Sequence, residues 1–275
     1  MTATLTAPRT SDGSALSTVG VIRSEWIKLR TVRSTVWSYA IIVAVSLGLA
    51  LLLSSVSDFG ATAVPEDQHN VILLQASTFG IYFGQLIVAV LGVLVISGEY
   101  STGMIRSTLT AVPKRIPALA AKALVLFAAT FVVGLVSAFG SLAIAMPILA
   151  GQGIQADFGD GTLLGDLLLS ALYLALVAVF ALGVGTILRS SAGGIAAALG
   201  VILLLPTVLQ VFAGLTQAEW AADLMPYLLS NAGTGMFTPS FDGSGLEQWQ
   251  NLLVVLVWVA VSIVGGAVLL KRRDA

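Results

Sequence analysis

The sequence predicts an all-α membrane protein with six transmembrane helices. Of its 275 residues, 57% are hydrophobic and 10% are charged, and the mean hydropathy is +0.98, whereas about a quarter of the residues in a soluble domain are charged. Because a hydrocarbon layer about 30 Å thick needs about 20 apolar residues in a helix, six stretches are long enough to cross it. They are residues 36–57, 77–97, 123–146, 167–188, 192–213 and 250–270.

The basic residues predict the orientation of these spans. All 13 Lys and Arg residues precede the first span, lie between spans two and three or four and five, or follow the sixth. The other three connections contain no Lys or Arg and carry acidic residues instead, namely Asp58, Glu66, Asp67, Asp157, Asp160, Glu219, Asp223, Asp242 and Glu247. The positive-inside rule therefore predicts a multi-pass protein of the plasma (inner) membrane with both termini in the cytoplasm.

The amino-terminal residues precede a helix that we expect at the membrane surface. Residues 1–18 are rich in Thr, Ser and Ala, which predicts a flexible cytoplasmic tail and no cleaved signal peptide. We expect residues 19–275 to form a single six-helix transmembrane domain. Apolar residues recur at helical spacing at Val19, Ile22, Trp26 and Leu29, and basic residues lie on the other sides of the same helix. This pattern predicts an interfacial helix that contacts membrane lipids through Arg23, Trp26, Lys28 and Arg30. A merely solvated helix is the alternative.

The connection after span two is longer than a turn requires. Residues 98–118 read GEYSTGMIRSTLTAVPKRIPA, in which Met104, Ile105 and Leu109 form a short apolar stripe beside Arg106. Pro113 and Pro117 are expected to end this helix before span three. The segment predicts a cytoplasmic docking helix, and the alternative is a basic loop whose cations snorkel to the interface.

Small residues and prolines predict how the spans pack. Gly80, Gly84 and Gly92 in span two, Gly134 in span three and Gly183 in span four permit close approach of neighbouring helices. Pro206 is expected to kink span five.

The long external segment, residues 214–248, is expected to form short amphipathic helices that dip into the outer leaflet. Trp220, Leu224 and Tyr227 lie at helical intervals, whereas Pro226, a turn at Gly233 to Gly235 and Pro239 exclude one continuous helix. An ordinary surface loop is the alternative.

Several kinds of chemistry have no supporting motif. The chain has no Cys and a single His, His69, so neither a Cys/His zinc site nor a Ser/His protease pair is expected within the membrane. No phosphate-binding loop of the GxxxxGK[ST] type occurs. We therefore expect no catalysis, no bound cofactor and no metal in this chain, and no nucleic acid among its partners.

The interior of the six spans carries only neutral polar groups. Coupled carriers usually need ionisable groups within the membrane, so a path lined by Gln85, Ser137, Thr207 and Gln210 suits an amphipathic or hydrophobic compound better than an ion. Each of these residues has an alternative role as a hydrogen-bond partner between helices.

Three segments carry a resemblance to a known family. RSEWIKLRTVRSTVW (residues 23–37), GEYSTGMIRSTLTAVPKR (residues 98–115) and the long external segment before span six resemble, in order, the permease subunits of ABC-2 type ATP-binding cassette exporters, in particular those of actinobacteria. In that family, Glu-x-x-x-Gly after span two opens a coupling helix that sits on the ATPase subunit. Glu99 and Gly103 match this motif.

The resemblance implies a permease powered by a separate ATPase. It assigns contact with two copies of that ATPase, which bind ATP and Mg²⁺, to the coupling helix, represented by Glu99, Tyr100, Gly103, Met104, Arg106 and Leu109. It also implies a second permease subunit, for which we expect a homodimer, and outward movement of a drug, antibiotic, peptide or lipid. The substrate, and the choice between alternating access and lateral extraction, stay open.

Two rival functions are consistent with parts of the sequence. A non-transporting immunity or scaffold protein would bind a peptide or lipid at the external segment without ATP. A secondary carrier would respond to an ion gradient, which the uncharged spans disfavour.

Overall fold

A computed structural model confirms the predicted fold class. It describes residues 18–57, 64–104, 115–159, 161–238 and 245–272, in which all regular structure is helical. Six helical segments there are long and apolar enough to cross a membrane. They are α2 (Arg33–Val56), η1 with α3 (Glu66–Gln68 and His69–Ser101), α5 (Arg115–Ala150), α6 (Thr162–Leu188), α7 with η2 and α8 (Ser191–Leu199, Gly200–Leu204 and Leu205–Thr216), and α11 (Gln248–Arg272).

Two of these helices extend well beyond the predicted spans. α3 has 33 residues and α5 has 36, although about 20 residues suffice to cross the hydrocarbon. The additional turns lie at the ends of the bundle, where hydropathy no longer marks the helix boundary. Residues 105–114, with Pro113 and most of the predicted docking helix, lie outside the described residues.

The central helix of the bundle is α6. It packs against α3, α5 and α11, and 78% of its most apolar window is buried. Glycines permit each of these approaches: a Cβ added at Gly92 would meet α6 at Ala178, one at Gly134 would meet Ala171, and one at Gly183 would meet Ser262 of α11, all within 2.9 Å. The predicted close packing at small residues is confirmed at these three positions.

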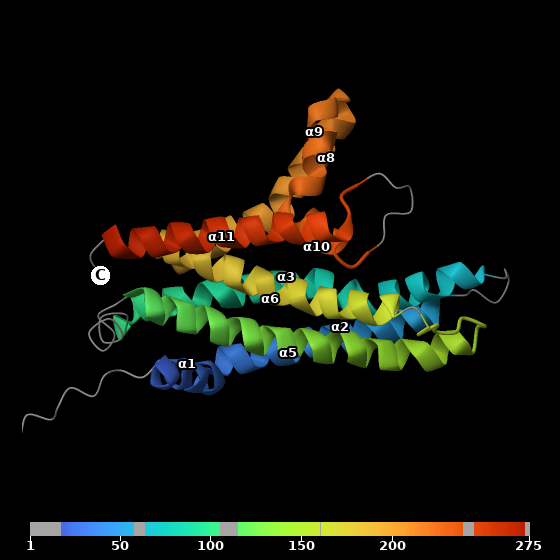
Figure 1. The fold of residues 1–275 in the computed structure, drawn as a ribbon, viewed down its shortest axis with the longest axis horizontal. Helices are drawn as coiled ribbons and strands as arrows, with labels where there is room; N and C mark the ends of the chain where they lie inside the picture. Colours follow the sequence, from blue (N-terminus) through green and yellow to red (C-terminus); the bar gives the residue numbers. More distant parts are fainter. Residues whose placement is uncertain (1–17, 58–63, 105–114, 160, 239–244, 273–275) are drawn as a thin grey trace, which may run out of the picture.

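Span five departs from a straight helix. Its first part, α7, packs on the bundle, but η2 is a π-helix and α8 contains no buried residue. Pro206, at the start of α8, lacks the N–H that would continue the helical hydrogen bonds. α8 turns away from the bundle, and its main contacts are with η2, α9 (Glu219–Leu224) and η3 (Met225–Tyr227) (Figure 1).

The external segment contains short helices, as expected, but not the expected turn. Gly233 and Gly235 lie in α10 (Leu229–Gly235), which packs on α11 and α6. An added Cβ would lie 1.9 Å from the Tyr173 ring at Gly233 and 2.6 Å from Asn251 at Gly235. The expected turn is therefore wrong, because these glycines serve close packing inside a helix and not chain reversal.

Helix α1 (Thr18–Thr31) lies at the end of the bundle where α11 ends (Figure 1). It packs mainly on α5 and contacts α2. Leu29 is buried in the core cluster that α3, α5 and α6 share, so α1 is an integral part of the fold at this end.

Candidate functional site

Four charged side chains from three helices meet beneath α1. This charge cluster consists of Glu25 and Lys28 of α1, Glu99 of α3 and Lys122 of α5. The Lys122 Nζ donates to Glu25 Oε2 at 2.5 Å and to Glu99 Oε1 at 2.8 Å. The Lys28 Nζ donates to Glu25 Oε1 at 2.6 Å and to Glu99 Oε1 at 3.0 Å. Each carboxylate thus accepts from both ammonium groups, which join α1 to the ends of α3 and α5.

Burial makes these four residues depend on one another. Glu25, Glu99 and Lys122 are at most 5% exposed, whereas the Lys28 side chain is 31% exposed. A buried charge that loses its partner is strongly destabilising, typically by about 3–5 kcal/mol. The formal charges sum to zero, so the charge cluster can be buried as a unit. Movement of one of these helices would therefore act directly on the other two.

The pKa of Lys28 reflects this environment. Burial lowers the pKa of its ammonium group, but hydrogen bonds and charge attraction from Glu25 and Glu99 outweigh that effect, so the pKa is raised above its ordinary value. Lys28 therefore stays charged at neutral pH and keeps its bonds to α3.

Two isolated acidic residues in the sequence could have indicated this charge cluster. Glu25 is the only acidic residue between Asp12 and Asp58, and Glu99 is the only one between Asp67 and Asp157. Two isolated acids in otherwise basic segments indicate ion pairing. From the sequence alone, Lys122 indicates only the orientation of the spans, and Glu25 has no predicted role.

The predicted coupling residues separate into an inward and an outward group. Glu99 is buried in the charge cluster, and the Arg189 guanidinium carbon lies 5.2 Å from the centre of the half-buried Tyr100 ring. Gly103, at φ 71°, and Met104 are exposed just beyond the end of α3. A Cβ at Gly103 would meet no atom within 4 Å. Arg106 and Leu109 lie outside the described residues.

A family model, that of the "ABC-2 family transporter protein", matches residues 19–275. The chain belongs to the ABC-2 transporter family. Its six apolar helices make it a multi-pass membrane protein, and the family makes it a permease of an ABC transporter. A comparison with curated proteins finds no match.

The interfacial-helix residues of this ABC-2 permease lie mainly on the outer side of α1. Arg23, Trp26 and Arg30 are exposed, whereas Lys28 takes part in the charge cluster. The face that packs on the bundle contains Glu25 and Leu29, so protein contacts cover part of the surface that the sequence pattern assigned to lipid.

The four residues predicted to line a substrate path do not come together. Gln85 and Ser137 are buried in the bundle, and Gln85 accepts a hydrogen bond from the Tyr173 hydroxyl. Thr207 and Gln210 are exposed on α8, where Thr207 donates to Leu203 O at 2.6 Å. The hydroxyls of Ser46, Ser137 and Ser141 are buried on α2 and α5 with no hydrogen-bond partner in the described part of the permease.

Proposed function

We propose that this chain is the permease subunit of an ATP-binding cassette exporter that moves an amphipathic or hydrophobic compound out of the cell. It would act with two cytoplasmic ATPase subunits, which bind ATP and Mg²⁺, and with a second permease copy in the plasma membrane. The chain itself would not be catalytic. The observation that carries this proposal is the charge cluster, which links Glu99, the acid of the Glu-x-x-x-Gly motif, to two other helices.

The proposed coupling runs from the exposed end of α3 into the bundle. An ATPase subunit would contact Gly103 and Met104, which are exposed. Glu99 lies one helical turn before Gly103 and is bonded to Lys28 and Lys122. A displacement of this end would therefore move α1 and α5 together with α3, because separating the buried charges is unfavourable.

The polarity of the spans supports the proposed class of cargo. The buried polar groups in the middle of the bundle, among them Gln85, Ser137 and Tyr173, are neutral. Neutral groups can bind polar atoms of a compound without the high desolvation energy of a buried charge.

The ends of the helices support the proposed orientation. Arg23, Arg30 and Lys271 lie at the end of the bundle that contains the charge cluster, and Glu66 and Asp157 lie at the other. We place the basic end in the cytoplasm, where the ATPase subunits are.

The test compares two glycines at opposite ends of the molecule. Gly103 and Gly153 both have positive φ values, 71° and 88°, and open space around an added Cβ. The permease is co-purified with the proposed ABC ATPase subunit, and vanadate-sensitive ATP hydrolysis is measured. We expect Gly103→Leu to reduce permease-dependent hydrolysis or subunit assembly about tenfold, and Gly153→Leu to leave both within twofold, although both changes strain the backbone by about 1–2 kcal/mol.

A Glu99→Gln variant tests the connection to the charge cluster. Removing its charge should weaken coupling while the complex still assembles, because Glu99 is buried and Gly103 forms the exposed contact. Full assembly and full hydrolysis in both Glu99→Gln and Gly103→Leu would refute the coupling role.

The second candidate function is ATP-independent capture of a peptide or lipid. The exposed Trp220 and Leu224 of α9, with the Phe212 ring 5.4 Å from that of Trp220, favour it. It requires ligand binding by the permease alone and no ATPase partner, so failure to isolate any ATPase complex would favour this function over export.

A further inference from the structure

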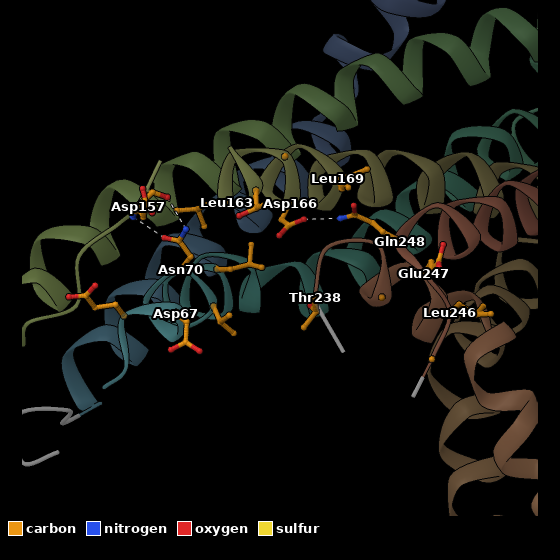
Figure 2. A pocket seen from close by; sticks show the side chains of 17 residues that line it. Asp67, Asn70, Asp157, Leu163, Asp166, Leu169, Thr238, Leu246, Glu247 and Gln248 are labelled. Atoms are coloured by element: carbon orange, nitrogen blue, oxygen red, sulfur yellow. Dashed lines mark hydrogen bonds between the residues drawn. The ribbon is translucent and has the colours of Figure 1, made fainter. Parts of the chain in front are cut away.

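A large cavity opens at the end of the bundle opposite the charge cluster. Its volume is about 760 Å³, within the range of about 300–1,000 Å³ that is typical of small-molecule sites. Four parts of the chain that are distant in sequence form its walls: η1 with the start of α3, the loop at Asp157, the start of α6, and residues 235–238 with 245–248 (Figure 2).

The walls combine apolar and acidic surfaces. Val71, Leu74, Leu163 and Leu169 supply apolar side chains. Glu66, Asp67, Asp157, Asp166 and Glu247 supply five carboxyl groups, and no residue of the lining is basic. The sequence has no Lys or Arg between Arg33 and Arg106, between Lys122 and Arg189, or between Arg189 and Lys271. Basic side chains that could neutralise the cavity are therefore absent from these external segments.

Hydrogen bonds between the walls fix the shape of the cavity. Asn70 Nδ2 donates to Asp157 O at 2.8 Å and Asp157 N donates to Asn70 Oδ1 at 3.0 Å, which ties α3 to the loop. Gln248 Nε2 donates to Asp166 Oδ1 at 2.8 Å, which ties the start of α11 to α6. Figure 2 shows both contacts. A cavity with walls held in this way needs little reorganisation to bind a ligand.

The arrangement of the carboxyl groups favours an organic cation over a metal ion. Among the described residues, no three His, Cys, Asp or Glu side chains are grouped closely enough to hold a metal. The acids are instead spread around the cavity, with Asp67 and Glu247 on different walls (Figure 2). A spread of negative charge over an apolar wall matches a compound with a positive charge on a bulky apolar body.

We propose that this cavity is an external binding site for cationic amphiphilic compounds. The apolar body would contact the Leu74 and Leu163 side of the cavity, and the acidic side chains would attract the cation. This inference rests on the proposed function in two respects. The proposed orientation places the cavity outside the cell, and the proposed export makes the bound compound a cargo on its release side. It narrows the proposed cargo to molecules with a positive charge.

The test measures binding of two probes of the same shape and opposite charge. Tetraphenylphosphonium and tetraphenylborate are titrated into the full-length permease in lipid nanodiscs, and empty nanodiscs correct for partition into lipid. The variant Asp67→Asn/Glu247→Gln removes two carboxylates from the cavity. The control Glu219→Gln/Asp223→Asn removes the same two residue types from α9, where both are exposed.

We expect the wild type to bind the phosphonium and not the borate in the cavity. The affinity for the phosphonium should fall about tenfold in the cavity variant, because two attractions at several ångströms in a partly aqueous site are lost, and should stay within twofold in the control. Unchanged affinity in the cavity variant, equal losses in both variants, or equal binding of both probes would each overturn the proposal. Thermal unfolding of each variant checks that it is folded.

A second measurement does not depend on the acidic variants. Because the chain contains no Cys, a Thr162→Cys variant carries one thiol at the cavity wall. Saturating phosphonium should slow its reaction with a neutral maleimide, and an unchanged rate would contradict binding there. These experiments use the permease without its ATPase, so their failure would leave the coupling result at Gly103 unaffected, and failed coupling would leave the binding result unaffected.

Discussion

Lys122 is the buried cation of the charge cluster. It is 5% exposed and bonded to two carboxylates that are themselves buried. Replacing such a cation with an apolar side chain leaves two negative charges with only Lys28 to share. The energetic effect comes mainly from the charges left behind and not from the lost bonds themselves.

We therefore predict that Lys122→Met lowers the free energy of unfolding by about 3–5 kcal/mol. Thermal or denaturant unfolding of the purified permease in detergent measures this change. Arg30→Met is the matched control, because Arg30 is exposed on α1, and it should change stability by no more than about 0.5 kcal/mol. Adding Glu99→Gln to Lys122→Met should recover part of the loss; full additivity of the two changes would contradict a shared network.

For single residues, the sequence predicted exposure or burial better than it predicted which residues contact one another. Arg23 and Trp26 are exposed on α1, where the sequence predicts lipid contacts, whereas Leu29 of the same predicted apolar face is buried. Gln85 accepts a hydrogen bond from Tyr173 of α6, which is the alternative role that the sequence offers for it. The contact between Glu25 and Lys122 joins residues 97 positions apart. No local periodicity encodes a contact over that distance, so only the isolated acids indicated it.

At the scale of elements, α3 and α7 meet through a serine pair. The Ser191 Oγ donates to Ser97 Oγ at 2.9 Å, and Gly194 of α7 faces Val93 of α3. This contact fixes the start of span five on the bundle, whereas α8 beyond η2 has no comparable anchor.

We predict that Ser97→Cys/Ser191→Cys forms a disulfide on mild oxidation. Side-chain oxygens this close place the two Cβ atoms near the separation that a disulfide requires. Because the chain has no other Cys, a non-reducing gel shift or a mass change of the single disulfide reports the link directly. The pair Ser101→Cys/Ser191→Cys is the control, since Ser101 is exposed at the end of α3. Equal cross-linking of the two pairs would contradict the α3–α7 contact.

The sequence predicted which helices exist more accurately than where they end and bend. Hydropathy located all six spans, because a lipid-exposed segment must be apolar along its length. It did not locate the start of α5 at Arg115, which lies well before the predicted start of span three at residue 123. It also assigned Gly233 to a turn. In the structure, Gly233 is small because the Tyr173 ring packs against it, and the local sequence does not distinguish such a glycine from one that a turn needs.

At the scale of the whole molecule, charge separates the two ends of the bundle. The charge cluster, Arg115 and Lys271 lie at one end, and the acidic cavity lies at the other. This separation was predictable from the sequence, because it follows the order of loops along the chain. The shape of the cavity was not, since Asp67, Asp157 and Glu247 come together only through tertiary packing.

We predict that an external thiol reagent reaches the acidic end of the bundle in intact cells but not the basic end. In a Gly153→Cys variant, a membrane-impermeant maleimide added to intact cells should label the protein, because Gly153 is exposed at the acidic end. A Ser24→Cys variant, exposed on α1, should be labelled only after the membrane is permeabilised. The reverse pattern would contradict the orientation predicted by the positive-inside rule.

The charge cluster also constrains the biogenesis of the permease. Glu25 leaves the ribosome 97 residues before Lys122, and Glu99 is synthesised between them. Until the third span has been inserted, the α1 carboxylate lacks its partner on α5, and burying it would be unfavourable. Helix α1 must therefore wait in water or among lipid headgroups while the first three spans enter the bilayer, which makes its docking a late, post-insertion step. Nascent chains arrested before Lys122 should accordingly expose this amino-terminal helix to protease.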